Sequence, residues 1–152
     1  MTIRQATLGD LSALVAFNQA IAKETEDVAL DSAILTPGIR RFLEQDRYGF
    51  YTVAETDGHV VGSLMITYEW SDWRNGVIWW VQSVYVSKKY RRQGIYRGLY
   101  QNVQKLAKAD GNVCGFRLYV EKDNTVAQDT YRSLGMTETY YRLFEDMENR
   151  AH

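Results

Sequence analysis

The stretch that decides the fold runs over residues 84–99 and reads V-Y-V-S-K-K-Y-R-R-Q-G-I-Y-R-G-L. Its first three residues are β-branched or aromatic, which predicts a β-strand. Apolar residues at helical spacing then predict an α-helix: Leu99, Val103 and Leu106. The loop between strand and helix contains Gly94, which lets the backbone bend tightly and approach a ligand closely. Because amides at a helix start lack internal partners and carry the positive end of the helix dipole, this turn is suited to bind an anion such as phosphate.

The charge around the turn supports an anion site. Residues 73–109 contain no Asp or Glu but eight basic residues: Arg74, Lys88, Lys89, Arg91, Arg92, Arg97, Lys105 and Lys108. The whole chain carries a net charge of −1, so this span carries +8 and the remainder carries −9. So local an asymmetry favours a specific polyanionic ligand over a generally basic protein. The alternative is a helix start whose basic side chains are simply solvated.

Two motifs resemble those of the GNAT acetyltransferases. Residues 91–96, R-R-Q-G-I-Y, are similar to the family's pyrophosphate loop Q/R-x-x-G-x-G/A at Arg91 and Gly94 and depart from it at Tyr96. Residues 124–136, N-T-V-A-Q-D-T-Y-R-S-L-G-M, are similar to the family pattern N-x-x-A-x-x-x-Y-x-x-x-G-F/M at every marked position. The resemblance covers nearly the whole chain in the order of its elements.

Composition sets the broad class. At 152 residues the chain is expected to form a single domain, residues 1–152. The single cysteine, Cys114, fits a reducing compartment, and its apolar neighbours favour a buried thiol over a nucleophile. Two histidines are too few for a metal site, so no metal is expected. We expect a cytoplasmic protein that binds neither membrane nor nucleic acid, because no long apolar run or signal peptide is seen and the pI is about 6.1.

The expected fold class is α/β (α+β), with the element order β-α-α-β-β-β-α-β-α-β. Strands are expected at residues 2–6, 50–55, 60–69, 77–86 and 113–121, and a final strand or hairpin at 137–146. A capping box at Thr7–Asp10 precedes the first helix, and Thr36-Pro37 is read as the start of the second. Turns are expected at Asp57-Gly58 and Asn75-Gly76. An antiparallel first half followed by a β-α-β crossover predicts a mixed, mostly antiparallel sheet with helices on both faces, as the resemblance also implies.

The strand at 77–86 is read as a regular alternation. This places Trp80, Gln82, Val84 and Val86 on one face and Val81, Ser83 and Tyr85 on the other.

The resemblance implies acetyl-CoA as cosubstrate and a set of residues to hold it. The pantetheine arm would pair with the backbone of the fourth strand, and the loop would hold the pyrophosphate through its amides. Asn124 would contact the cofactor arm and also cap its helix. The implied cofactor residues are Val84, Tyr85, Val86, Arg91, Arg92, Gln93, Gly94, Ile95, Tyr96, Arg97 and Asn124.

Transfer of an acetyl group to an amine needs a proton donor and a proton acceptor. Tyr131 matches the family tyrosine that protonates the leaving thiolate, although its spacing also fits the buried face of a helix. The family's glutamate position on the fourth strand falls at Trp80, which is no base. Glu69 is the nearest carboxylate in sequence and the expected base. The alternatives are Glu24 or Glu26, Glu121, or a water relay.

The acceptor site is expected at two places. Glu24 and Glu26 form an acidic stretch with Asp27 that could attract an ammonium acceptor, or could be a solvated loop. Trp70 and Trp73 flank a turn. They could form a pocket wall for an amine, or a contact between two copies in a homodimer.

Three functions from different classes remain open at this point. The first is an N-acetyltransferase for a primary amine on a small molecule. The second is a protein or peptide acetyltransferase, and the third is a non-catalytic acyl-CoA-binding module, suggested by the missing fourth-strand glutamate.

Overall fold

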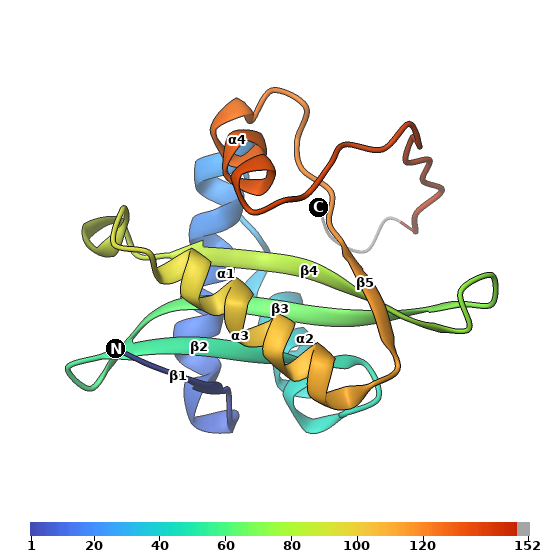
Figure 1. Ribbon diagram of the computed structural model, residues 1–152. Coiled ribbons are helices and arrows are strands. Elements are labelled where there is room, and N and C mark those ends of the chain that lie inside the picture. The colour runs from blue at the N-terminus through green and yellow to red at the C-terminus, as the bar shows by residue number, and fades with distance from the viewer. Residues whose placement is uncertain (149–152) are drawn as a thin grey trace. The chain divides into compact units, whose positions relative to one another are not determined.

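Five strands form one sheet in the computed structural model, which describes residues 1–148 (Figure 1). The strands lie in sequence order across the sheet: β1 Thr2–Gln5, β2 Gly49–Thr56, β3 His59–Ser71, β4 Gly76–Val86 and β5 Val113–Arg117. The first three junctions are antiparallel, and only β4 and β5 run parallel. The expected mixed, mostly antiparallel sheet is therefore confirmed.

Helices cover both faces of this sheet, as expected. α1 (Leu11–Glu26) and α2 (Ser32–Glu44) lie on one face, and α3 (Ile95–Asp110) lies on the other (Figure 1). The apolar stripe of α3 faces the sheet and is buried: Ile95, Leu99, Tyr100, Val103 and Ala107. The predicted helix is confirmed, but Leu106 lies outside its buried stripe and is exposed.

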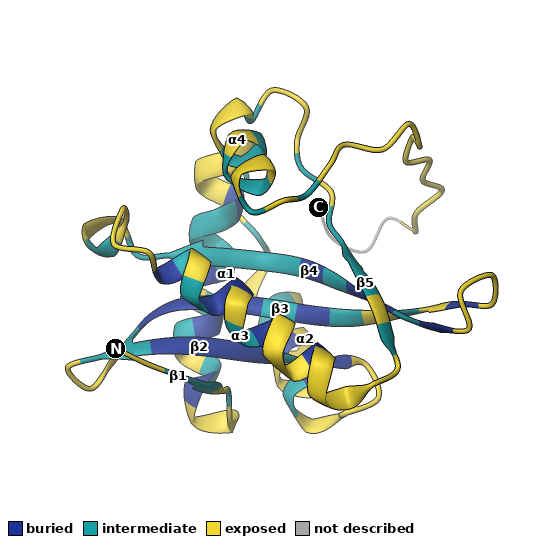
Figure 2. Cartoon of the chain, viewed as in Figure 1, coloured by how far each residue is buried: buried dark blue, intermediate teal, exposed yellow. Residues whose placement is uncertain are grey.

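The core beneath α1 and α2 joins the helices to the middle of the sheet. Leu14, Ile39 and Phe42 from the helices pack with Tyr51 and Val53 of β2. The Phe42 and Tyr51 rings meet edge to face at 5.6 Å, a favourable geometry for aromatic pairs. Figure 2 shows that burial concentrates in the central strands, whereas the loops are exposed.

Two of the predicted local signals are confirmed. The Thr7–Asp10 capping box forms, with the Thr7 amide donating to the Asp10 carboxylate at 2.8 Å. Asp57 and Gly58 join β2 to β3 as a two-residue turn with positive φ at both positions (51° and 77°).

The predicted start of α2 is wrong. The helix begins at Ser32, where the Asp31 side chain accepts from the Ala33 amide at 2.9 Å. Pro37 lies inside the helix rather than at its first position. The proline forgoes one backbone hydrogen bond, and the Asp31 cap with the buried Ile39 and Phe42 holds the helix through it.

The β3–β4 connection is longer than a two-residue turn. Ser71 pairs with Gly76, so residues 72–75 form the loop. Asn75 takes the positive φ (50°) within it, and Gly76 begins β4.

The last part of the sheet prediction also changes. β5 ends at Arg117 rather than 121, and residues 137–146 form no strand. Cys114 is exposed, which contradicts the expected buried thiol. The reason is that β5 lies at the edge of the sheet and carries an irregularity there, because Val77 pairs with Val113 whereas Ile78 pairs with Gly115.

The chain divides into two units, residues 1–118 and residues 119–152. The first contains the sheet and α1 to α3. The second contains α4 (Thr125–Ser133), followed up to residue 148 by a segment without helix or strand, in which Tyr140, Tyr141, Leu143 and Phe144 are exposed. Within residues 1–148, no helix combines the length and apolarity that a membrane span needs.

Candidate active site

An irregularity in β4 interrupts its pairing with β3. Met65 pairs with Gln82, but Ser63 pairs with Tyr85, so β4 holds one residue more than β3 over this interval. Ser83 has φ +48°, a left-handed conformation that a strand residue rarely adopts. These features define a β-bulge at residues 83–84.

The bulge reverses the side-chain alternation, so the predicted faces of β4 are wrong beyond Gln82. Regular alternation predicts Tyr85 on the face opposite Gln82. Its ring instead lies 5.0 Å from that of Phe17 on α1, and Gln82 faces the same side, where its amide donates to Thr67 at 2.6 Å. One inserted residue shifts the period-2 pattern by one, which exchanges the two faces.

The pairing of β4 with β5 ends shortly before the bulge. Their last paired residues are Trp80 and Arg117, whereas β4 continues to Val86. Val81, Gln82, Tyr85 and Val86 keep partners in β3, whereas no residue of 81–86 pairs with β5. An unpaired strand edge offers backbone donors and acceptors to an extended ligand.

The predicted anion loop follows directly. After a 3₁₀ turn (Lys88–Tyr90), Arg92 and Gly94 take positive φ values of 64° and 78°, and α3 begins at Ile95. The first helical hydrogen bond runs from the Gly98 amide to the Gly94 carbonyl at 2.9 Å. The amides that precede Gly98 in α3 therefore face the loop, at the positive end of the helix dipole.

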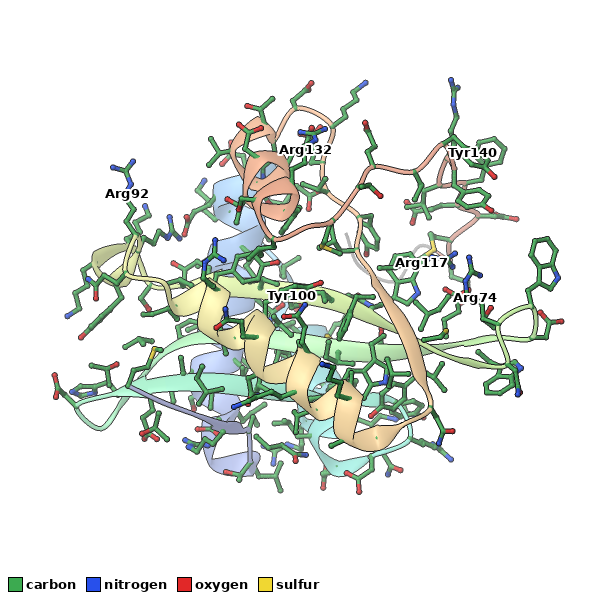
Figure 3. The ribbon with its side chains drawn as sticks, viewed as in Figure 1. Arg74, Arg92, Tyr100, Arg117, Arg132 and Tyr140 are labelled. Atoms are coloured by element: carbon green, nitrogen blue, oxygen red, sulfur yellow. The ribbon has the colours of Figure 1, made fainter. Side chains whose placement is uncertain are left out.

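The side chains of the loop differ in whether they contact the rest of the protein. Arg92 is exposed and extends away from the protein (Figure 3). Tyr96 lies within α3 with an ordinary φ, and its ring is 6.5 Å from that of Tyr100, one turn along. Its bulk is thus accommodated along the helix at the position where the related motif has a small residue.

Arg91 folds back on the preceding strand. Its Nε donates to the Val86 carbonyl at 2.8 Å, and its guanidinium carbon lies 5.3 Å from the centre of the Tyr85 ring. One terminal nitrogen donates to Glu24 at 2.9 Å. Glu24 also accepts from the Tyr85 hydroxyl at 2.9 Å.

These contacts set the protonation of Glu24 and Tyr85. Partial burial would raise the pKa of Glu24, but the hydrogen bonds from Arg91 and Tyr85 together hold that pKa below its ordinary value. Burial and the neighbouring Glu24 carboxylate raise the pKa of Tyr85. Glu24 therefore stays ionised, and the tyrosine keeps its proton.

Glu69 lies on β3 in a second polar cluster. Its carboxylate accepts from the indole nitrogen of Trp80 at 2.7 Å and from Arg117 at 3.1 Å. The hydrogen bond from Trp80 lowers the pKa of Glu69 most, and Arg117 and the charge of Arg74 lower it further. Partial burial acts in the opposite direction, but the pKa of Glu69 stays below its ordinary value. Such a carboxylate is a weaker base than a free glutamate.

The remaining predicted acceptor residues are less enclosed. Trp70 is 61% exposed, and Trp73, in the β3–β4 loop, is 89% exposed. Glu26 is exposed at the last position of α1. Across residues 1–148, no group of three or more His, Cys, Asp or Glu side chains is placed to hold a metal ion.

The second unit carries the other predicted residues. Asn124 caps α4, and its side-chain oxygen accepts from the Ala127 amide at 3.2 Å. Tyr131 lies on α4, where its carbonyl accepts from the amides of Leu134 and Met136 at the helix end. The side chain of Tyr131 is partly buried.

The comparisons with known proteins agree with this geometry. The family model described as "Acetyltransferase (GNAT) family" matches residues 16–136. The chain belongs to the GNAT acetyltransferase family. A possible acetyltransferase from Clostridium difficile 630 is 46% identical in sequence, covers 97% of each chain and superposes with a TM-score of 0.90.

More distant solved structures share the fold. A probable acetyltransferase is 23% identical, covers 97% of this chain and 100% of its own, and has a TM-score of 0.83. An aminoglycoside antibiotic 6'-N-acetyltransferase from Acinetobacter haemolyticus is 18% identical, covers 97% of this chain and 99% of its own, and has a TM-score of 0.77. None of the curated protein sequences matches the chain.

The GNAT chain is thus an acetyltransferase, and acetyl-CoA is the acetyl donor of its family. The site contains two residues that the sequence reasoning did not assign to it. Ser83 lies at the bulge with its positive φ, and Arg117 holds Glu69. A serine between β-branched and aromatic strand residues was the one weak signal for the bulge, and nothing in the sequence paired Arg117 with Glu69.

Proposed function

We propose that this GNAT enzyme transfers the acetyl group of acetyl-CoA to a primary amine of a small molecule, and that residues 1–152 act as a single acetyltransferase domain. The observation that carries the proposal is the divergence of β4 from β5 beside the anion loop. β4 loses its β5 partner beyond Trp80, bulges at Ser83 and ends next to the loop at 91–97. One extended ligand with an anionic end fits this continuous surface.

The loop and the open strand edge fit the two ends of that donor. The amides of Gln93 to Arg97 would hold the pyrophosphate, with positive charge from Arg92. The backbone of Val84 to Val86 would pair with the pantetheine arm as an added strand does, with Asn124 as a further contact. A side chain added at Gly94 would meet no protein atom within 4 Å, so the backbone is open to close approach there.

Acetyl-CoA supplies a thioester, and the chain must orient an amine toward it and manage two protons. The amine nitrogen bonds to the carbonyl carbon while the carbon–sulfur bond breaks. Negative charge develops on the thioester carbonyl oxygen during this attack. We assign the hydrogen-bond donor to that oxygen to a backbone amide near Val84, at the bulge. Tyr131 would give its phenolic proton to the departing thiolate. Because the ordinary pKa of a thiol is about 8.5 and that of a phenol about 10, the field of the site must favour this transfer. The tyrosinate would regain a proton from solvent, which takes up the proton that the acylated nitrogen loses.

Glu69 remains the proposed carboxylate for the acceptor. Because Trp80 and Arg117 keep it ionised, it is well placed to attract and orient an ammonium group. Its low basicity means that the ammonium proton would pass to water held by the carboxylate rather than remain on Glu69. Glu26, Trp70 and Trp73 are proposed to line the acceptor side, with the tryptophan ring faces attracting a cation.

A small amine is proposed because the exposed tryptophan rings of the β3–β4 hairpin can attract a cation through their faces. The same exposed tryptophans would suit a homodimer contact. A cytoplasmic location fits the single cysteine.

The test is an acetylation assay with a panel of small primary amines and a panel of peptides, beside calorimetric titration with acetyl-CoA. We expect acetyl-CoA binding and turnover with at least one small amine. Turnover with peptides but with no small amine would refute the small-molecule acceptor and indicate a peptide or protein acetyltransferase. Binding without any turnover would indicate an acyl-CoA-binding module and refute the catalytic proposal.

A further inference from the structure

Arg91 occupies the first position of the cofactor loop, yet its guanidinium points back toward β4 and α1. It donates to the Val86 carbonyl at 2.8 Å and to Glu24 at 2.9 Å. Hydrogen bonds on two sides thus hold the guanidinium. A guanidinium held in this way fixes backbone geometry, because its planar donors bind in one orientation.

Glu24 is held equally firmly. Its two carboxylate oxygens are divided between Arg91 and the Tyr85 hydroxyl, at 2.9 Å each. The Tyr85 ring packs between Phe17, 5.0 Å away, and the Arg91 guanidinium. Phe17 and Glu24 lie two turns apart on α1, so they present the same side of that helix.

The three side chains link segments that are far apart in the sequence. Glu24 is near the end of α1, Tyr85 follows the β4 bulge, and Arg91 starts the loop that leads into α3. The bulge is required for this link, because without it Tyr85 would face away from α1. By contrast, the next arginine, Arg92, extends outward from the loop (Figure 3).

We propose that Glu24 and Tyr85 are positioning residues for the acetyl donor: they hold Arg91 on Val86 and thereby keep the backbone of residues 91–97 shaped for a diphosphate. This inference rests on the proposed donor site. It changes the expected role of Glu24, which acts on the donor side through Arg91 instead of attracting the acceptor. It also changes the role of Arg91, whose charge is neutralised by Glu24 and serves the loop rather than the phosphate.

The experiment compares acetyl-CoA binding by calorimetry in the wild type, Glu24→Gln, Arg91→Gln and the double variant. We expect each single variant to raise the Kd for acetyl-CoA about fivefold, the order of an ion pair with charged hydrogen bonds at a half-exposed site. The double variant should be no weaker than Arg91→Gln alone, because the two residues act through one contact. Steady-state kinetics should show a higher KM for acetyl-CoA and an unchanged KM for the amine.

Two further variants keep the test specific. Asp27→Asn removes a carboxylate from the same end of α1, where Asp27 pairs with Lys23 in solvent, and it should leave acetyl-CoA binding unchanged. Asparagine also tolerates the positive φ of 53° at that position. Tyr85→Phe keeps the ring on Phe17 and removes only the hydroxyl, so it should reproduce a smaller part of the Glu24→Gln effect.

Three results would overturn the inference. Tighter binding in Glu24→Gln would mean that Glu24 competes with phosphate for Arg91. Additive losses in the double variant would mean that the residues act separately. A rise in the KM for the amine alone would return Glu24 to the acceptor site. If the wild type itself fails to bind acetyl-CoA, the donor site is wrong, and that outcome is distinct from all three.

Discussion

Replacing Gly94 with alanine tests the donor site most directly, because the chain contains a matched control. Gly94 precedes α3 with φ 78° and ψ 14°, and Gly111 follows the same helix with φ 82° and ψ −13°. A Cβ added at either position would meet no protein atom within 4 Å. The two substitutions therefore carry the same backbone strain and no clash, and they differ in which end of α3 they alter.

The expected effect on stability is small and equal. Placing alanine in the left-handed region costs roughly 1–2 kcal/mol, and the stiffer unfolded chain returns roughly 0.4–1 kcal/mol. Each variant should lose about 1 kcal/mol, or about 3 °C in Tm for a chain of this size. Thermal melts followed by circular dichroism measure this loss.

The expected effect on binding is unequal. In Gly94→Ala the new methyl group occupies the open space beside the loop amides, where a phosphate would approach. We expect its Kd for acetyl-CoA to rise at least about tenfold, which corresponds to ~1.4 kcal/mol. Gly111→Ala should bind as the wild type does. Equal binding by both variants would refute the placement of the phosphates, and equal weakening would show that the effect acts through the stability of α3.

Three further predictions concern other parts of the chain. Tyr131→Phe should lower kcat by about 10²-fold or more while leaving the Kd for acetyl-CoA unchanged, as stopped assays and calorimetry would show. Arg4 holds the pKa of Asp10 below its ordinary 3.8, so Asp10 stabilises the fold above that pH, and this stability is lost as the pH falls through the folded pKa. The Asp10→Asn variant should have a lower urea midpoint than the wild type at neutral pH. As the pH falls, its midpoint should decrease less steeply than that of the wild type. Gly49→Ala should destabilise the fold by ~3 kcal/mol or more in urea titrations, because the added Cβ would lie 1.9 Å from the Ile66 carbonyl oxygen at a φ of 143°.

The sequence was sufficient wherever the signal was local and periodic. Asp57 and Gly58 form their hairpin turn because left-handed residues suit two-residue loops, and Thr7 with Asp10 forms its capping box through one short contact. Pro37 misled the prediction because proline is so common at the first helical position. The competing signal was Asp31, which caps the helix through the Ala33 amide, and the buried Ile39 and Phe42 outweigh the one hydrogen bond that the proline omits.

The candidate site depended on a feature that no local pattern specifies. Residues 81–86, V-Q-S-V-Y-V, read as an unbroken strand, and period-2 alternation then puts Tyr85 on the face away from Gln82. The bulge at Ser83 arises from the pairing of β4 with β3, a contact between segments that the sequence does not align residue by residue. Once the alternation reverses, Tyr85 comes to Glu24, Glu24 to Arg91, and Arg91 to the end of β4. A single inserted residue thus decides whether the acidic end of α1 faces an acceptor or supports the loop for the donor.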